Sequence, residues 1–268
     1  MTYLCATCGT QYPPAAQPPA SCPVCEDGRQ YVPHDTGQVW LPYEEFLAGH
    51  SAELRVDHGI LGIGCTPSFG IGQRALLVES SGGNVLWDCI PYLDDEIVRS
   101  IESAGGLAGI AISHPHYYSA MVEWAHAFDC PIHLHEDERR WVMRPDPAIR
   151  FWSGERLELS SGLTLIRCGG HFPGGQVLHW EERAALLSGD IVQIVPDRRY
   201  VSFMWSYPNL VPLPAATVER IGAALEPFAF ETIHGAWWGR VIENDGATVV
   251  RRSVERYVAA LTEPGLPS

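Results

Sequence analysis

The sequence has no apolar run long enough for a membrane-spanning helix, which needs about 18 or more consecutive apolar residues. The N-terminus, MTYLCATCGT, also lacks the basic flank and the hydrophobic stretch of a secretory signal. These two absences argue against a membrane partner. We therefore expect a protein that stays in the cytoplasm.

Basic side chains are scarce, with 18 Lys and Arg residues against 32 Asp and Glu residues and a formal net charge of −14. Proteins bind a phosphate backbone through Lys and Arg, so we do not expect nucleic acid as a partner. Hydrophobic residues make up 46% of the chain, enough to fill a core. The composition predicts a globular protein, and the expected partner is a small-molecule substrate.

Disulfides are not expected, because thiols stay reduced in the cytoplasm and the eight cysteines are then metal ligands or buried apolar residues. Four of them form two CxxC pairs, Cys5 with Cys8 and Cys22 with Cys25, separated by 13 residues rich in proline and alanine. Such a loop cannot build a core, but four thiolates on one tetrahedral ion can fold it. The alternative is a set of unligated or redox-active cysteines.

The cysteine cluster resembles a zinc ribbon or a rubredoxin-like pair of knuckles. Zinc and iron both accept four thiolates in tetrahedral geometry, and we expect zinc. We assign this module to residues 1–32 and a connector to residues 33–50. The remaining residues, 51–268, form the main domain.

The main domain alternates apolar strands with helices and glycine-rich loops. Strands are expected in RALLVES, GNVLWD and LAGIAIS, and again in LTLIRC and AALLSGD. Helices are expected over residues 94–104, 118–128, 215–226 and 248–261. This rhythm predicts a layered α/β architecture with sheets inside and helices outside.

Residues suited to a metal site follow the ends of successive strands. They are His114, His116, His171, Asp190 and His234. Side chains at strand ends converge on one rim even when they are far apart in the sequence. Neutral imidazoles and a carboxylate suit a zinc-class ion and leave one position for water, which then loses its proton near neutral pH.

With these motifs the chain resembles the metallo-β-lactamase fold superfamily over roughly residues 50–262. The family has an Asp at the end of an early strand, an HxHxDH loop, a GH turn, a GD turn and a late His. The matching stretches are WDC at Asp88, HPHYYS from His114 to Ser119, GGHFPGG at His171, SGDIV at Asp190 and IHG at His234. The resemblance implies a four-layer αββα sandwich, with the four-cysteine ribbon as a small N-terminal addition.

The resemblance implies one complete metal site, whose ligands are His114, His116, His171 and Asp190. A second site would need Asp at 118 and His at 119, where this chain has Tyr118 and Ser119. A phenol and a hydroxyl are poor zinc ligands, so we expect one ion, zinc rather than iron. His135, at another strand end, is the residue that would rescue a second ion.

Two residues are candidates for the chemistry. His234, without a second metal to bind, titrates near neutral pH and is the candidate acid or base; otherwise it is a satisfied histidine on the rim. Tyr118 is the candidate donor to a developing oxyanion; otherwise it packs at the start of a helix. Asp88, Ser119 and His135 are expected beside the ligands, with Asp88 orienting the loop.

Three functions stay open at this point. The first is a metal-dependent hydrolase that attacks an ester, lactone, thioester or amide. The second is a mononuclear-iron oxidoreductase in which the cysteine module is the electron carrier, and the third is a binding protein that has lost catalysis. Aromatic loops at residues 202–210 and 234–240 wall a pocket in one interpretation; in the other they cap the sandwich or form the contact of a homo-oligomer.

Overall fold

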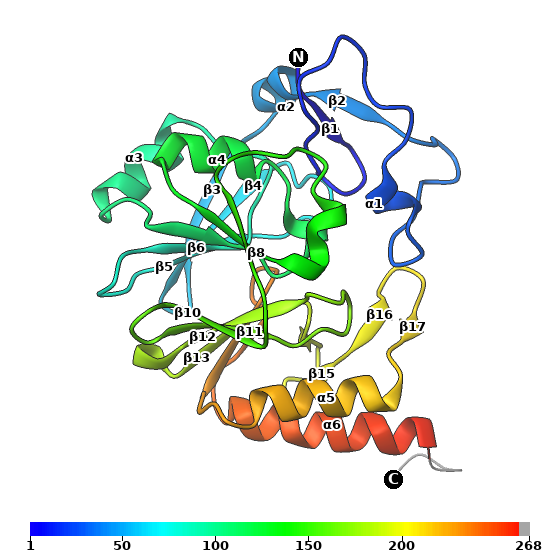
Figure 1. Ribbon diagram of the computed structural model, residues 1–268, viewed down its shortest axis with the longest axis vertical. Coiled ribbons are helices and arrows are strands. Elements are labelled where there is room, and N and C mark those ends of the chain that lie inside the picture. The colour runs from blue at the N-terminus through cyan, green and yellow to red at the C-terminus, as the bar shows by residue number, and fades with distance from the viewer. Residues whose placement is uncertain (263–268) are drawn as a thin grey trace. The chain divides into compact units, whose positions relative to one another are not determined.

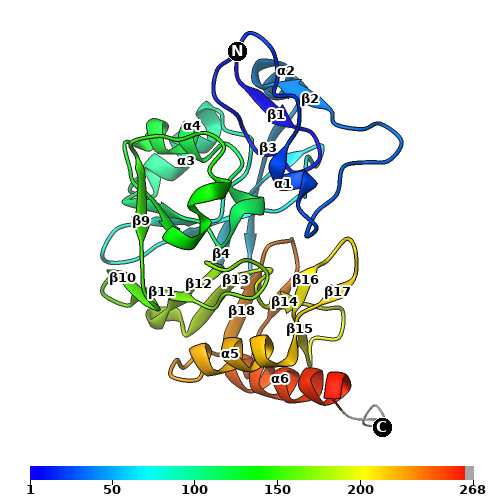
Figure 2. The same ribbon diagram turned by 45° about the vertical axis from the view of Figure 1, so that its right-hand side comes forward.

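The computed structural model describes residues 1–262. The chain divides into two compact units, one over Met1–Trp152 and one that begins at Ser153 (Figures 1 and 2). Each unit contains one large sheet. The predicted module boundaries at residues 32 and 50 stay predictions.

The first unit is built on a seven-stranded sheet. Its strands, in spatial order, are β3 (Ser51–Asp57), β4 (Ile60–Thr66), β5 (Ala75–Val78), β6 (Val85–Trp87), β7 (Gly109–Ala111), β8 (Ile132–His135) and β9 (Ile149–Trp152). The first four pair antiparallel, and β6 to β9 pair parallel. Parallel strands end at the same sheet edge, so the residues after β6, β7 and β8 come together there.

Strands β5, β6 and β7 are buried along their whole length, as expected of strands covered on both faces. Helices α3 (Asp95–Ser103) and α4 (Met121–Phe128) connect the parallel strands and lie over one face of the sheet (Figure 1). Asp94 caps α3 by accepting hydrogen bonds from the N–H groups of Glu96 and Ile97. A short 3-10 helix, η2 (Glu136–Trp141), joins β8 to β9.

The predicted helix over residues 118–128 begins late. A 3-10 turn, η1 (Pro115–Tyr117), comes first, and α4 starts only at Met121. Ser119 lies between them with a φ of 42°, in the left-handed region, so a regular helix cannot run through it. The histidine loop is therefore an irregular segment with its own backbone anchors.

The first 50 residues contain little regular structure. Strand β1 (Tyr3–Cys5) pairs antiparallel with β2 (Trp40–Pro42), and a single turn of helix, α1 (Pro23–Glu26), carries the second CxxC pair. Helix α2 (Tyr43–Gly49) follows β2 and buries Phe46. The connector predicted over residues 33–50 thus contains β2 and α2.

The second unit is built on a six-stranded sheet. Its order is β10 (Arg156–Ser160), β11 (Leu163–Arg167), β12 (Gln176–Trp180), β13 (Ala185–Gly189), β18 (Thr232–Gly235) and β19 (Val241–Ile242). All neighbours pair antiparallel except β13 and β18, which are parallel. A 3-10 turn, η3 (Glu181–Arg183), joins β12 to β13. The parallel pair brings the ends of β13 and β18 to one sheet edge.

The long connection between β13 and β18 contains two short hairpins and a helix. The hairpins are β14 (Gln193–Ile194) with β15 (Val201–Ser202), and β16 (Met204–Ser206) with β17 (Val211–Pro212). Helix α5 (Ala215–Leu225) follows them and packs beside α6 (Gly246–Thr262). Both helices lie over one face of the sheet (Figure 2).

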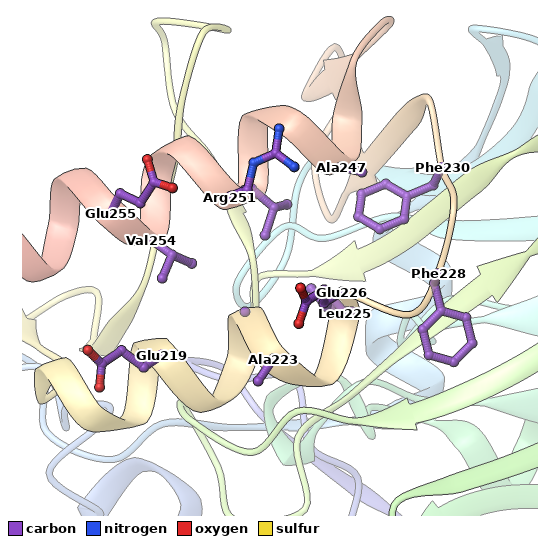
Figure 3. A pocket seen from close by; sticks show the side chains of 12 residues that line it. Glu219, Ala223, Leu225, Glu226, Phe228, Phe230, Ala247, Arg251, Val254 and Glu255 are labelled. Atoms are coloured by element: carbon purple, nitrogen blue, oxygen red, sulfur yellow. The ribbon is translucent and has the colours of Figure 1, made fainter.

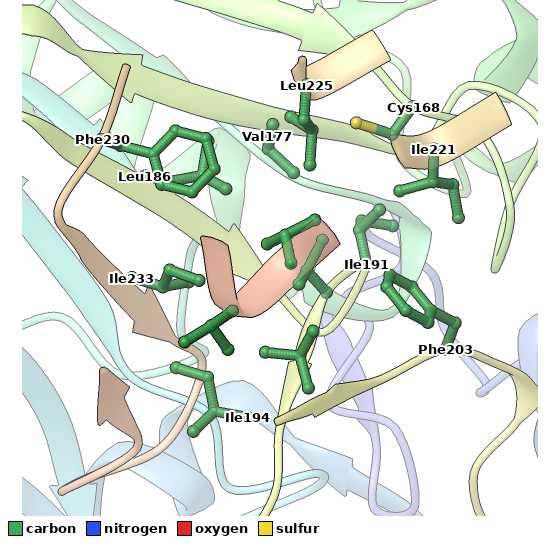
Figure 4. Packing of buried hydrophobic residues seen from close by; sticks show 14 of the residues in the cluster. Cys168, Val177, Leu186, Ile191, Ile194, Phe203, Ile221, Leu225, Phe230 and Ile233 are labelled. Atoms are coloured by element: carbon green, nitrogen blue, oxygen red, sulfur yellow. The ribbon is translucent and has the colours of Figure 1, made fainter. Parts of the chain in front are cut away.

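The core of the second unit lies between this sheet and the two helices (Figure 4). Ile233 of β18 is fully buried in it, among side chains from the helices and the β14–β15 hairpin. The helix residues of this core lie in predicted helices, whereas the β14–β15 hairpin was not predicted from the sequence. No helix within residues 1–262 is long and apolar enough to cross a membrane.

Truncating Ile233 to alanine should lower the free energy of unfolding by about 2–5 kcal/mol, because it leaves a cavity in a close-packed core. Urea denaturation followed by tryptophan fluorescence measures the change. The matched control is Leu210→Ala, which removes a side chain that is 79% exposed and should cost less than about 0.5 kcal/mol. Equal losses for the two variants would contradict the packing shown in Figure 4.

Candidate metal centres

The four predicted cysteine ligands lie together in the first unit. The sulfur atoms of Cys5, Cys8, Cys22 and Cys25 are within 4.8 Å of one another, and all four residues are buried. Cys5 Sγ lies 3.5 Å from Cys25 Sγ, and Cys8 Sγ lies 3.7 Å from Cys22 Sγ, too far for disulfides. Four sulfurs at this spacing fit a tetrahedral zinc or iron ion.

Local backbone bonds shape both cysteine pairs. The Gly9 N–H donates to Cys5 O at 2.8 Å and closes the first turn, where Gly9 has a φ of 78°. In the second pair the Cys25 N–H donates to Cys22 O at 2.9 Å. A proline after Cys22 starts the single helical turn, since its missing N–H is no loss at that position.

Polar side chains donate hydrogen bonds to two of the four sulfurs. Tyr12 donates its hydroxyl to Cys22 Sγ at 3.2 Å, and Gln38 Nε2 donates to Cys5 Sγ at 3.2 Å. Burial, and after it the charge of Cys22, raises the pKa of Tyr12 far above its usual value, so the phenol stays a donor. Donors of this kind stabilise thiolates, which a metal ligand must be.

The histidine loop is fixed at its start by Asp88. The backbone N–H of Ser113 donates to Asp88 Oδ1 at 2.7 Å, and Ser113 Oγ lies 2.9 Å from His114 Nδ1. With Nδ1 engaged, the ligand nitrogen of His114 is Nε2. His116 follows in the η1 turn, and the ligand nitrogens of the two histidines lie within 4.8 Å of one another.

Asp88 is buried and has a φ of 59°. Burial raises the pKa of Asp88 to about 7, although the hydrogen bonds from Ser113 act in the opposite direction. The carboxyl is therefore partly protonated near neutral pH, and Oδ1 accepts the Ser113 N–H.

Asp88→Ala should cost about 1–3 kcal/mol of unfolding free energy, because it leaves the buried Ser113 N–H without its acceptor. Asp88→Asn keeps an oxygen at the same place and should cost less than half as much. Urea denaturation of both variants makes the comparison. Equal losses of unfolding free energy in the two variants would mean that the charge of the carboxylate stabilises the loop, and not the hydrogen bond that its oxygen accepts.

The same carboxyl predicts a pH dependence. Since the pKa of Asp88 is raised to about 7 in the folded protein, the folded state binds more protons than the unfolded state between about pH 4 and pH 7. The free energy of unfolding of metal-free protein should therefore fall as pH rises through this range. The fall should be smaller in Asp88→Asn, and urea titrations at pH 5 and pH 7 measure it. An identical slope in both proteins would assign the effect to other groups.

Tyr118 and Ser119, which replace the second-site ligands of the resembled family, are both buried. Burial, and after it the charge of Glu138, raises the pKa of Tyr118 well above its usual value, so this phenol is neutral. Ser119 Oγ accepts a hydrogen bond from Gln73 Nε2 at 3.0 Å, and Ser119 O accepts one from the Gln11 N–H at 3.1 Å. Ser119 is therefore held by two glutamines.

His135 lies at the end of β8 and is buried. Its Nδ1 accepts from the Asp137 N–H at 3.3 Å, and its ring meets Trp152 edge-on at 4.7 Å. Glu138, in η2, is a buried carboxylate at the same sheet edge. It was not among the residues predicted from the sequence, although it belongs to a run of three acidic residues that directly follows the strand end at His135.

The second unit holds the other candidate ligands. His171 follows β11 in a turn, and its Nδ1 lies 2.9 Å from Trp205 O and 3.2 Å from Met204 O. These carbonyls fix the tautomer and make Nε2 the ligand nitrogen. The turn needs Gly170, which has a φ of 84° and leaves no room for a Cβ, since that atom would lie 2.8 Å from Ile221 Cδ1.

Asp190 and His234 lie at the ends of the parallel strands β13 and β18, and both are buried. Tyr207 donates its hydroxyl to Asp190 O at 2.6 Å, and its ring centroid is 5.5 Å from that of His171. The loop at residues 202–210, which includes Tyr207, was predicted to wall a pocket, to cap the sandwich or to form an oligomer contact. This loop instead supports two candidate ligands, a role that no local pattern signals.

A separate apolar hollow of about 330 Å³ lies between α5 and α6 (Figure 3). Phe228, Phe230 and Val254 line it, with Glu219 and Arg251 at its edge. None of the candidate ligands lines this hollow. It is a gap between helices and not part of the metal chemistry.

Comparison with known proteins gives one close relative. The chain is 46% identical to the uncharacterized protein YmaE of Bacillus subtilis (strain 168) over 266 residues, which cover 97% of this chain and 96% of the relative. No family model matches the chain.

Solved structures show the same fold at low sequence identity. The metallo-β-lactamase DIM-1 is 14% identical with a TM-score of 0.60, over 79% of this chain and all of that chain. The metallo-β-lactamase FIM-1 from Pseudomonas aeruginosa, in its mono-zinc form, is 14% identical with a TM-score of 0.56, over 77% and 96%. The predicted α/β fold of the metallo-β-lactamase type is confirmed.

Proposed function

The chain belongs to the family of YmaE and has the metallo-β-lactamase fold, and from this premise we propose that it is a metal-dependent hydrolase with a mononuclear active site. The substrate is a small molecule with an ester, lactone, thioester or amide group. The protein acts in the cytoplasm. The observation that carries the proposal is the presence of buried imidazoles in both units, with the tautomer of His171 fixed by backbone carbonyls.

The proposed ligands are His114, His116, His171 and Asp190. The backbone carbonyls at Nδ1 of His171 leave its Nε2 for the metal, and the Ser113 hydroxyl contacts Nδ1 of His114. Three imidazoles and a carboxylate form a donor set that suits zinc, and they also accept iron.

The mononuclear state is supported by what replaces the second-site ligands. Tyr118 is a buried neutral phenol, and the Ser119 hydroxyl already accepts a hydrogen bond from Gln73. Neither group is a good ligand for a divalent zinc-class ion. In this proposal His135 is not a metal ligand, because its Nδ1 already accepts a hydrogen bond from the backbone N–H of Asp137.

A metal ion held by these ligands would supply Lewis-acid chemistry and would lower the pKa of a water bound to it. His234, buried at the end of β18, moves the proton to the leaving group in this proposal. Tyr118 donates a hydrogen bond to the oxyanion, for which a neutral phenol is required. Asp88 holds the loop through the Ser113 N–H throughout.

The test is metal content per chain by elemental analysis of untagged protein, combined with a screen of ester, lactone and thioester hydrolysis. The expected result is two zinc ions per chain and metal-dependent hydrolysis of at least one class. Protein without metal at the histidines, or with metal and no hydrolysis, would contradict the proposal.

A second function is tested in the same measurement. The cysteine cluster, with Tyr12 and Gln38 donating to its sulfurs, fits iron as well as zinc and would then carry electrons. Iron in both sites with visible colour would favour the mononuclear-iron oxidoreductase. Colourless zinc protein argues for the hydrolase.

A further inference from the structure

We propose that the four-cysteine module positions the histidine loop, so that metal bound at the cysteines strengthens metal binding at His114 and His116. The inference rests on the proposed function in one respect: both sets of residues bind metal ions. The coupling runs through Gln11, which belongs to the module, and Ser119, which ends the histidine loop. Both residues are in the first unit and both are buried.

The first contact joins the backbones. The Gln11 N–H donates to Ser119 O at 3.1 Å. Gln11 is three residues after the ligand Cys8, and Ser119 is three residues after the ligand His116. Two short chain segments and one hydrogen bond therefore separate a ligand of one centre from a ligand of the other.

The second contact uses the side chain of the same glutamine. Gln11 Nε2 donates to Glu123 Oε1 at 3.1 Å, and Arg144 donates to both Gln11 Oε1 and Glu123. Glu123 lies in the first turn of α4, directly after the histidine loop. Gln11 thus binds the loop at Ser119 and the helix that follows it.

The backbone at Gly70 packs closely against the first cysteine turn. A Cβ on Gly70, which has a φ of 59°, would lie 3.0 Å from Gly9 N and 3.1 Å from the carbonyl carbon of Cys8. A Cβ on Gly9 would lie at an ordinary contact distance, 3.6 Å, from Ser119 Oγ. The first cysteine turn is therefore close to both Gly70 and the end of the histidine loop, and the hydrogen bond from the Gln11 N–H to Ser119 O joins the turn to the loop.

Hydrogen bonds also connect Ser119 to the start of the histidine loop. Gln73 Nε2 donates to Ser119 Oγ at 3.0 Å and to Cys89 O at 2.9 Å. Cys89 is adjacent to Asp88, whose carboxylate accepts the Ser113 N–H before His114. Both ends of the loop are thus tied to one network. Ser119, at a position where the resembled family has a metal ligand, anchors the loop to the cysteine module.

The cysteine module depends on its metal more than on its core. Between Cys8 and Cys22 the chain is rich in proline and alanine and its middle is exposed, so the binding energy of the ion is a large part of the module's folding energy. Loss of that ion loosens the turn that holds Gln11. The histidine loop is then less ordered before metal binds, so binding costs more conformational entropy. The affinity of the histidines for metal falls by roughly 10-fold to 100-fold.

The experiment uses the full chain and two readouts, zinc affinity by chelator competition and amide hydrogen exchange of residues 113–124. Cys5→Ser with Cys8→Ser removes the cysteine-bound ion. Gln11→Leu keeps all four cysteines and removes the side-chain contact to Glu123 and Arg144. The matched control is Gln17→Leu, the same change at an exposed position of the same module.

We expect the cysteine double variant to bind zinc at the histidines roughly 10-fold to 100-fold more weakly and to exchange faster over residues 113–124. Gln11→Leu should show the same changes at a smaller size with the cysteine-bound ion retained, and Gln17→Leu should match the unaltered protein. Unaltered affinity and exchange in Gln11→Leu would overturn the proposal, even where the double variant fails to fold.

Failure of the proposed function gives a different result. If the unaltered protein binds a single ion, at the cysteines, the histidines are not a metal site and the affinity readout disappears. Exchange over residues 113–124, before and after that ion is removed by a chelator, then decides the coupling by itself. Unchanged exchange overturns the positioning role.

Discussion

His116→Ala is expected to remove the metal ion of the histidine centre and to lower kcat/KM for a hydrolysed ester by about 10³-fold or more. The physical reason is that the metal both supplies the nucleophile and stabilises the developing charge, contributions of several kcal/mol. His116 is buried in the η1 turn, so no other side chain replaces it without moving the loop. Elemental analysis and steady-state kinetics measure the two losses.

The matched control is His126→Ala. His126 lies on α4 with its side chain 55% exposed, and its Nε2 lies 2.9 Å from an Asp146 carboxylate oxygen. Its replacement should leave two ions per chain and the full rate. If His116→Ala kept both ions and the rate, the histidine loop would have to be abandoned as the active centre.

Cys22→Ser is expected to cause the second large effect, loss of the metal ion from the cysteine module and unfolding of that module. Structural zinc sites in small peptides contribute apparent binding energies of about 10–16 kcal/mol, and loss of one thiolate removes much of this. Metal content should fall from two ions to one. Amide exchange over residues 1–42 should become fast.

Cys65→Ser is the control for this change. Cys65 is half-buried on β4, outside the cluster, and its Sγ lies 3.6 Å from Pro67 O. Its replacement should leave the metal content unaltered. A Cys22→Ser protein that still held two ions would show that the four sulfurs do not share one ion.

Much of the fold follows from local pattern. The expected helices over residues 94–104, 215–226 and 248–261 match α3, α5 and α6 within two residues, because each has an apolar stripe or a clear cap. The cysteine cluster follows from spacing alone, since two CxxC pairs suffice to gather four sulfurs. These features depend on residues close together in the sequence.

The rest depends on contacts between distant residues, which leave no periodic signal. Gln11 is hydrogen-bonded to Ser119, which follows it by more than a hundred residues, and no pattern in either segment predicts this contact. The late start of α4 follows from this contact and from the left-handed Ser119. Tyr207 likewise donates to Asp190 from a loop whose aromatic residues suggested a pocket wall, a cap or an oligomer contact, and not a support for a ligand.

The pairing of β1 with β2 has a consequence for the order of events during synthesis. All four cysteines and both strands lie within the first 42 residues, whereas Ser119 is made roughly 80 residues later. At about 5–20 residues per second the nascent module has several seconds in which to take up its ion. If both centres bind metal as proposed, the cysteines would meet their ion before any histidine ligand exists, and the two centres would be loaded one after the other.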